Sequence, residues 1–215
     1  MFKKLFASFG ARKAVPGASA RPYKSEELDL VYQLLFCDDP DLVKATPVQA
    51  SLFGTATDPR VVQTIGEDAG EESRVRLLAW HWLRSSGQPF ASREVLGVVV
   101  EVPLDEGLDA LAAYADGSVR YINHTGRVAV FEGAPAEVAE QGKRLVHAAI
   151  PLAVRGPVKQ RMAPPALGTV RFSLLAADGL HVREGTFAEI ARDQLTGPVL
   201  QEAQRLLDTV VKQGT

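Results

Sequence analysis

The spacing of apolar residues changes once along the chain, at Glu94. Before that point apolar side chains recur three and four residues apart, as in Leu28, Val31, Leu34 and Leu35. From Glu94 onward they alternate with a period of two, and β-branched residues become frequent. The first spacing is typical of an amphipathic helix and the second of a strand. The sequence therefore predicts a helical first part followed by a sheet.

Capping residues mark where the first helices begin. Ser25 precedes two glutamates, and the pairs Asp39-Pro40 and Asp58-Pro59 each combine an N-cap residue with proline in the first helical turn. A longer helix is expected to follow an acidic stretch and to end near Ser85. The apolar face predicted for this longer helix consists of Val75, Leu78, Ala79 and Trp82.

The second part of the chain predicts an antiparallel sheet. Asp116-Gly117 and Asp178-Gly179 are two-residue hairpin signals, and His124-Thr125-Gly126 closes a longer turn. Strands joined by tight turns pair antiparallel, so the fold class is α+β, with the order ββββ-α-ββ-α from residue 94. The strands are expected at 94–102, 108–115, 118–123, 127–132, 169–176 and 180–187, with helices at about 136–150 and from Thr196 to the end.

The same patterns divide the chain into three segments. Residues 1–24 are predicted to be a basic, flexible N-terminal arm, residues 25–90 a helical segment, and residues 91–215 an α+β domain. Residues 25–215 can also form one compact unit. Residues 151–168, with four prolines, are expected to form an extended loop, which is long for a compact domain and suggests a functional role.

Charge is unevenly distributed along the chain. Residues 1–25 contain six basic residues and no acid, so the remainder carries a net charge of −8, because the whole chain carries −2. The basic residues are interleaved with Ala, Pro, Val and Gly, so no specific nucleic-acid partner is expected. No apolar run is long enough to cross a bilayer. The balance of apolar and charged residues is that of a folded globular protein.

The N-terminus leaves three interpretations open. It can be a targeting segment, because it is basic and acid-free; it can be a disordered start; or it can form a short amphipathic helix. In the third case one face would contact a protein partner or, weakly, an anionic membrane surface. The candidate contact residues are Phe2, Lys3, Lys4, Leu5, Phe6 and Phe9.

Motifs for catalysis and cofactor binding are missing from the sequence. It contains no Gly-x-Ser-x-Gly elbow, no phosphate-binding loop and no dinucleotide fingerprint. None of the four histidines has a second one at helical metal-binding spacing, and the single cysteine, Cys37, permits no intrachain disulfide. We therefore predict no catalytic residue, no metal and no cofactor. One apolar-flanked cysteine agrees with a reducing, cytoplasmic compartment.

The stretch 115–132 holds the densest group of polar residues. Arg120, Asn123, His124 and Arg127 are predicted to gather at one hairpin end, where they can form a binding pocket or serve ordinary turn chemistry. Along these strands both faces carry apolar groups: Val119 and Tyr121 on one face, Ile122 on the other. The sheet is therefore expected to be covered on both sides or to lie at a dimer contact.

Two functions follow from these observations. The first is a non-enzymatic protein-interaction or chaperone-like module of a bacterial-type cytoplasm, with a protein partner or a second copy of itself. The order of elements from residue 94 resembles that of small bacterial secretion chaperones, which dimerise and hold client segments; the four-strand run and the long helical front depart from it. The alternative is a small-molecule or anion-binding protein, or a hydrolase-like enzyme, with a pocket near the 120–127 hairpin end.

Overall fold

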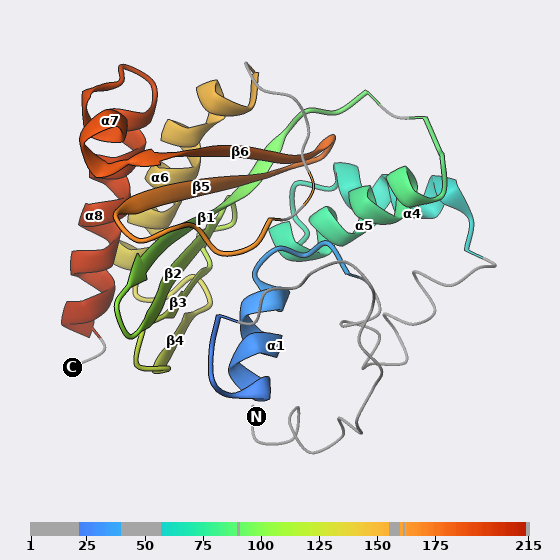
Figure 1. Ribbon diagram of the computed structural model, residues 1–215. Helices are drawn as coiled ribbons and strands as arrows, with labels where there is room; N and C mark the ends of the chain where they lie inside the picture. Colours follow the sequence, from blue (N-terminus) through green and yellow to red (C-terminus); the bar gives the residue numbers. More distant parts are fainter. Residues whose placement is uncertain (1–21, 40–56, 90, 155–159, 161, 214–215) are drawn as a thin grey trace.

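A six-stranded antiparallel sheet forms the centre of the computed structural model (Figure 1). The structure describes residues 22–39, 57–89, 91–154, 160 and 162–213. The strand order is β4-β3-β2-β1-β5-β6, so β1 lies in the middle and β4 and β6 form the two edges. The strands are β1 (Val95–Leu104), β2 (Gly107–Tyr114), β3 (Val119–Ile122), β4 (Val128–Phe131), β5 (Thr169–Ala176) and β6 (Gly179–Thr186). The predicted α+β class and antiparallel pairing are confirmed.

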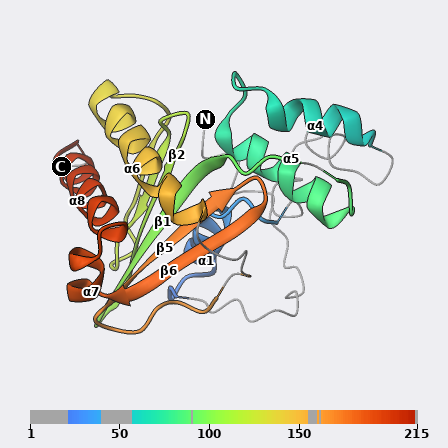
Figure 2. The ribbon, with the colours of Figure 1, turned by 90° about the horizontal axis from the view of Figure 1, so that it is seen from above.

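Helices cover both faces of this sheet, as Figure 2 shows from above. The C-terminal helices α6 (Ala136–Val154), α7 (Phe187–Arg192) and α8 (Thr196–Gln213) cover one face. The N-terminal helices α1 (Glu26–Leu34), α4 (Pro59–Glu67) and α5 (Ser73–Ser85) cover the other. Side chains of β1 therefore enter a core on each side: Val98 packs toward α6 and α8, and Val99 toward the N-terminal helices. This explains why β1 reads as a nearly continuous apolar run.

Three helix N-caps, Ser25, Asp58 and Thr186, accept hydrogen bonds through their side chains, whereas Glu72, the N-cap of α5, makes no such bond. Ser25 accepts a hydrogen bond from the backbone of Leu28, Asp58 from that of Arg60, and Thr186 forms a capping box with Glu189. Ser25 and Asp58 are therefore confirmed as caps, whereas Thr186 begins α7, a helix that the sequence did not predict. The short helix expected after Asp39-Pro40 lies outside the described residues.

The buried face of α5 is wider than predicted. Trp80, Leu77 and Leu83 are buried, whereas Val75 and Trp82 are only partly buried. The reason is that α5 lies between the sheet and α4, so two of its sides are covered. Trp80 contacts α4 closely: a Cβ added to Gly66 would lie 2.7 Å from the indole ring.

The helix predicted at 136–150 extends further than expected. As α6 it continues to Val154, with Pro151 inside it, so residues 151–154 are helical and not part of a loop. Its apolar face packs on the sheet and on α8, and this packing outweighs the cost of one proline near the helix end. Within the described part of the chain no helix is both long and apolar enough to cross a membrane.

Candidate functional site

The β3–β4 turn is built around the side chain of Asn123. Its Oδ1 accepts hydrogen bonds from the backbone N–H of Thr125 (3.1 Å) and of Arg127 (2.8 Å), and from the Thr125 hydroxyl (2.8 Å). Gly126 adopts φ +87°, which favours glycine. Asn123 therefore shapes the turn. The Arg127 side chain is exposed beside it.

His124 is held on this turn by a carboxylate of the neighbouring strand. Its Nδ1 lies 3.0 Å from Asp109 Oδ1, and its backbone N–H donates to the same oxygen at 2.6 Å. The Tyr121 hydroxyl donates to the other oxygen, Oδ2, at 3.0 Å. Burial and the Asp109 charge raise the pKa of Tyr121, so the hydroxyl stays protonated and remains a donor. With Nδ1 turned to Asp109, the Nε2 of a neutral His124 ring carries the free lone pair.

Arg120 lies apart from the other three predicted residues. Its guanidinium donates to the carbonyls of Val119 and Phe131 (3.1 Å each) and pairs with Glu132 at 2.5 Å. Glu132 follows the far end of β4, on the opposite side from the turn. The structure thus brings Asn123, His124 and Arg127 together on one turn and directs Arg120 away from it. Their predicted role as a binding site stays a prediction.

A groove lies between the β3–β4 turn, the β1–β2 turn and the start of α1. Its volume is about 570 Å³. His124 and Thr125 lie on one wall, Lys24 and Ser25 on another. The groove is narrow near Gly107, where an added Cβ would lie 2.5 Å from the carbonyl oxygen of His124. The ionisable residues that line it, besides His124, are Tyr23, Lys24, Asp105 and Glu106.

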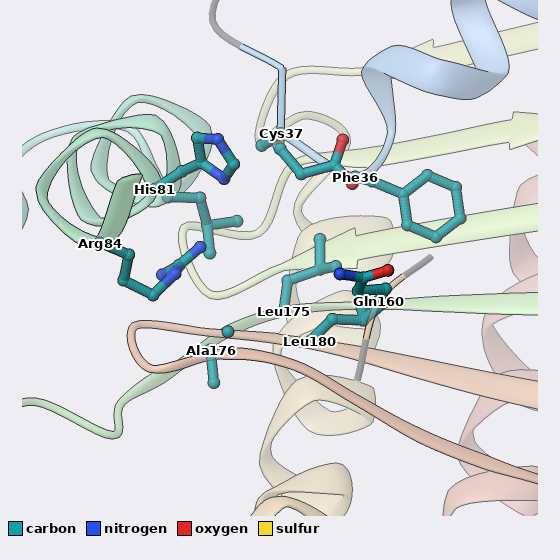
Figure 3. A pocket seen from close by; sticks show the side chains of 11 residues that line it. Phe36, Cys37, His81, Arg84, Gln160, Leu175, Ala176 and Leu180 are labelled. Atoms are coloured by element: carbon teal, nitrogen blue, oxygen red, sulfur yellow. The ribbon is translucent and has the colours of Figure 1, made fainter. Parts of the chain in front are cut away.

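A smaller cavity of about 260 Å³ lies between α5 and the β5–β6 hairpin (Figure 3). His81 and Arg84 project into it from α5, and Leu175 and Leu180 face them from the hairpin. Arg84 donates a hydrogen bond to the carbonyl of Ala177, which ties α5 to the hairpin. Burial and the adjacent Arg84 charge lower the pKa of His81, which favours the neutral form of its ring.

Cys37 lies at the edge of the same cavity and is buried. Burial raises the pKa of its thiol, although the nearby Arg74 opposes this. A thiol with a raised pKa is a poor nucleophile. Its burial and raised pKa therefore favour a structural over a reactive role for Cys37.

The one charged residue in the middle of β1, Glu101, has a 1 % exposed side chain. Its Oε1 accepts a hydrogen bond from the Tyr32 hydroxyl at 2.6 Å, and its Oε2 accepts a longer one from Ser173 (3.4 Å). Arg171 lies 3.8 Å from Oε2 and also pairs with Glu184 at 2.8 Å. Sequence reasoning missed this network; a single acid inside a buried apolar run was the signal that could have revealed it.

The edge strand β4 carries two exposed apolar side chains on one face of the sheet. Ala129 and Phe131 pack toward the C-terminal helices, as alternation predicts. Val128 and Val130 point to the other face and are 42 % and 39 % exposed. The expectation that the sheet is covered on both sides therefore holds for the inner strands and fails at β4, which the N-terminal helices do not reach far enough to bury.

The N-terminal contact candidates Phe2, Lys3, Lys4, Leu5, Phe6 and Phe9 lie outside the described residues. Among the residues that the structure does describe, no group of three or more His, Cys, Asp or Glu side chains is placed to hold a metal ion.

No protein-family model matches this chain, and no curated protein matches it significantly.

Proposed function

We propose that this protein is a non-enzymatic protein-interaction module of a bacterial-type cytoplasm, which binds its partner by adding a strand to the β4 edge of its sheet. The observation that carries this proposal is the open pair Val128 and Val130 on an edge strand. Exposed apolar edge strands are sites at which other chains pair.

The hydrogen-bond pattern of the β3–β4 hairpin supports the same edge. The N–H of Asn123 donates to the carbonyl of Arg127 at 3.0 Å, so these two residues form a hydrogen-bonded pair. Such pairs alternate with non-hydrogen-bonded ones along an antiparallel ladder. Ile122–Val128 and Arg120–Val130 are therefore non-hydrogen-bonded pairs. It follows that the N–H and C=O groups of Val128 and Val130 point away from β3, toward the open edge.

The opposite edge of the sheet differs in character. On β6, Arg183 and Glu184 place charges along the strand, and no large apolar residue of this strand is exposed. Charged side chains are a common protection against edge pairing. Between Arg127 and Glu132, β4 has no charged residue. This contrast favours β4 as the contact edge.

The test compares complexes recovered from native cells after gentle crosslinking. Wild type, Val130→Pro and Val130→Asp are compared with Val211→Asp, which changes an exposed valine on α8 (47 %, against 39 % for Val130). We expect the complex with wild type and Val211→Asp and its loss with both Val130 variants. In the complex, the Val128 and Val130 amides should exchange hydrogen more slowly than in the free protein. Equal recovery by all variants, or unchanged exchange at both amides, would contradict the proposal.

A second candidate function is small-molecule binding in the groove beside the 120–127 hairpin end. The pairing of Asp109 with His124 on the groove wall favours it, because it orients the ring and leaves Nε2 available. Asp105 and Glu106 favour a neutral or cationic ligand over an anion. Among the described residues no serine, threonine or cysteine side chain hydrogen-bonds His124, so the geometry supports binding rather than hydrolysis.

The ring ¹⁵N shifts of His124, followed during titration with neutral and cationic small molecules, test this second candidate. A ligand should shift them in wild type and bind less tightly to His124→Gln. Asp109→Asn should weaken binding as well, because the ring loses its fixed orientation. A library that shifts no His124 signal would remove this candidate.

A further inference from the structure

We infer that the partner at the β4 edge is a second copy of this chain, joined β4 to β4 about a two-fold axis into one continuous sheet. This inference rests on the proposed use of that edge. Its basis is that β4 is complementary to itself in hydrogen bonding, in apolar side chains and in charge.

Hydrogen bonding selects the register. A two-fold axis perpendicular to the sheet makes the two strands antiparallel and keeps each face continuous, so opposite residues must point to the same face. The outward backbone groups belong to Val128 and Val130. If Ala129 lies on the axis, Val128 of each copy faces Val130 of the other. All the outward N–H and C=O groups of these valines are then paired.

The side chains fit the same register. On one face the exposed valines of both copies form a single apolar cluster, which covers the surface that the N-terminal helices leave open. On the other face, Arg127 lies opposite Phe131 of the second copy. There its aliphatic stem can cover the ring and its guanidinium can interact with the ring face. No like charges are placed opposite one another.

Charge favours the antiparallel arrangement further. Arg127 precedes β4 and Glu132, which also pairs with Arg120, follows it, so the strand has a basic and an acidic end. Antiparallel pairing brings the basic end of each copy beside the acidic end of the other. The contact is short, because β4 has only four residues. Stable interfaces typically bury about 1,600 Å² in total, which is more than a contact between two short strands is expected to bury. We therefore expect a concentration-dependent dimer with a dissociation constant on the order of micromolar.

Disulfide trapping tests the register. In a non-hydrogen-bonded antiparallel pair the Cα atoms are about 4.5 Å apart, which is within the range that a disulfide bridges. Ala129→Cys should therefore form the dominant crosslinked dimer under mild oxidation. In Val128→Cys and in Val130→Cys, the cysteine of one chain lies two residues out of register with the same cysteine of the second chain. Crosslinking of these variants should therefore be weak. Wild type is the background control, because Cys37 is buried. Preferential crosslinking through position 128 or 130 would overturn the register.

Sedimentation equilibrium of the purified protein tests the second copy itself. Wild type and Val211→Asp should dimerise as concentration rises, whereas Val130→Pro should stay monomeric with an unchanged circular dichroism spectrum. Val130→Asp serves as a second variant in case the proline disturbs the hairpin. If the wild type stays monomeric up to high concentration while native complexes still protect the β4 amides, the second copy is refuted and the interaction module stands. If the amides gain protection in neither setting, both proposals fail.

Discussion

Replacing Tyr32 by phenylalanine removes one hydroxyl from the contact between α1 and the sheet. That hydroxyl is the donor to Glu101 Oε1, at 2.6 Å. The other contacts of the carboxylate, from Ser173 at 3.4 Å and Arg171 at 3.8 Å, are longer and involve Oε2. Tyr32→Phe therefore leaves one oxygen of a buried carboxylate without that hydrogen bond.

The expected cost follows from the charge of the acceptor. A hydrogen bond to a charged group contributes about 1.5–3 kcal/mol, against about 1 kcal/mol for a neutral pair. We expect Tyr32→Phe to lower the free energy of unfolding by about 2 kcal/mol, which for a chain of this size lowers Tm by about 4–8 °C. The matched control is Tyr23→Phe, whose hydroxyl donates at 2.9 Å to the neutral carbonyl of Leu108. It should cost about 1 kcal/mol.

Urea unfolding at pH 8, followed by the fluorescence of the buried Trp80 and the partly buried Trp82, measures both variants. The same Tyr32 substitution made in a Glu101→Gln background should cost only about 1 kcal/mol, because the acceptor is then neutral. A Tyr32→Phe protein that loses no more stability than Tyr23→Phe would refute the reasoning, since the buried carboxylate would not depend on this donor.

Three further predictions concern pH and close packing. Burial raises the pKa of Glu101 in the folded protein. Wild type should therefore be most stable relative to Glu101→Gln below about pH 4.3, the pKa of an unfolded glutamate, and should lose that advantage as pH rises through the folded pKa. Unfolding titrations from pH 4 to 8 check the sign. Partial burial raises the pKa of Asp116, but hydrogen bonds from Ser118 and Ser73 outweigh this effect and lower the pKa. Asp116→Asn should therefore lower the free energy of unfolding by about 1 kcal/mol near neutrality, and this loss should shrink as pH falls through the lowered pKa. Gly107→Ala should lower the free energy of unfolding by about 1–3 kcal/mol in urea, because the new methyl group meets a backbone oxygen. In the control Gly70→Ala the methyl group meets only a side-chain oxygen at 3.2 Å, so the loss should be much smaller. Equal losses would contradict this.

The sheet could be predicted from the sequence because its signals are local. Asp116-Gly117 and Asp178-Gly179 fix the hairpins, and the period of two fixes which residues share a face. The apolar run of β1 carried further information: a strand buried on one face alternates, so a continuous run already indicated helices on both sides. The order of the strands, with β5 beside β1, depends on the crossover through α6 and is not encoded in any short stretch.

The predictions of the helices were wrong where tertiary contacts determine which residues are helical or buried. The apolar face of α5 was predicted as one stripe, but α4 adds a second contact surface and buries Trp80 as well. Pro151 is a stop signal in isolation, yet packing of α6 on the sheet carries the helix past it. The six-residue helix α7 is too short to show an apolar period, although its capping residues Thr186 and Glu189 are present in the sequence.

The candidate sites were harder to predict for a related reason. Asp109 and His124 are fifteen residues apart and meet only because β2 pairs with β3 in the observed register. Tyr32 and Glu101 are 69 residues apart and meet only through the docking of α1. Sequence spacing alone cannot predict either pair.

In the β3–β4 hairpin the polar residues stabilise the structure, and apolar residues form the exposed surface. Arg120 is occupied by Glu132 and by two strand carbonyls, and Asn123 by the turn itself, so these polar groups hold the hairpin in shape. The side chains that this shape leaves open are Val128 and Val130. A charged or polar residue at either position would preserve the strand and protect the edge from pairing. Two exposed valines, whose backbone groups point to the open edge, favour association instead, so the interaction proposal rests on the apolar residues of a stretch whose polar residues first suggested a site.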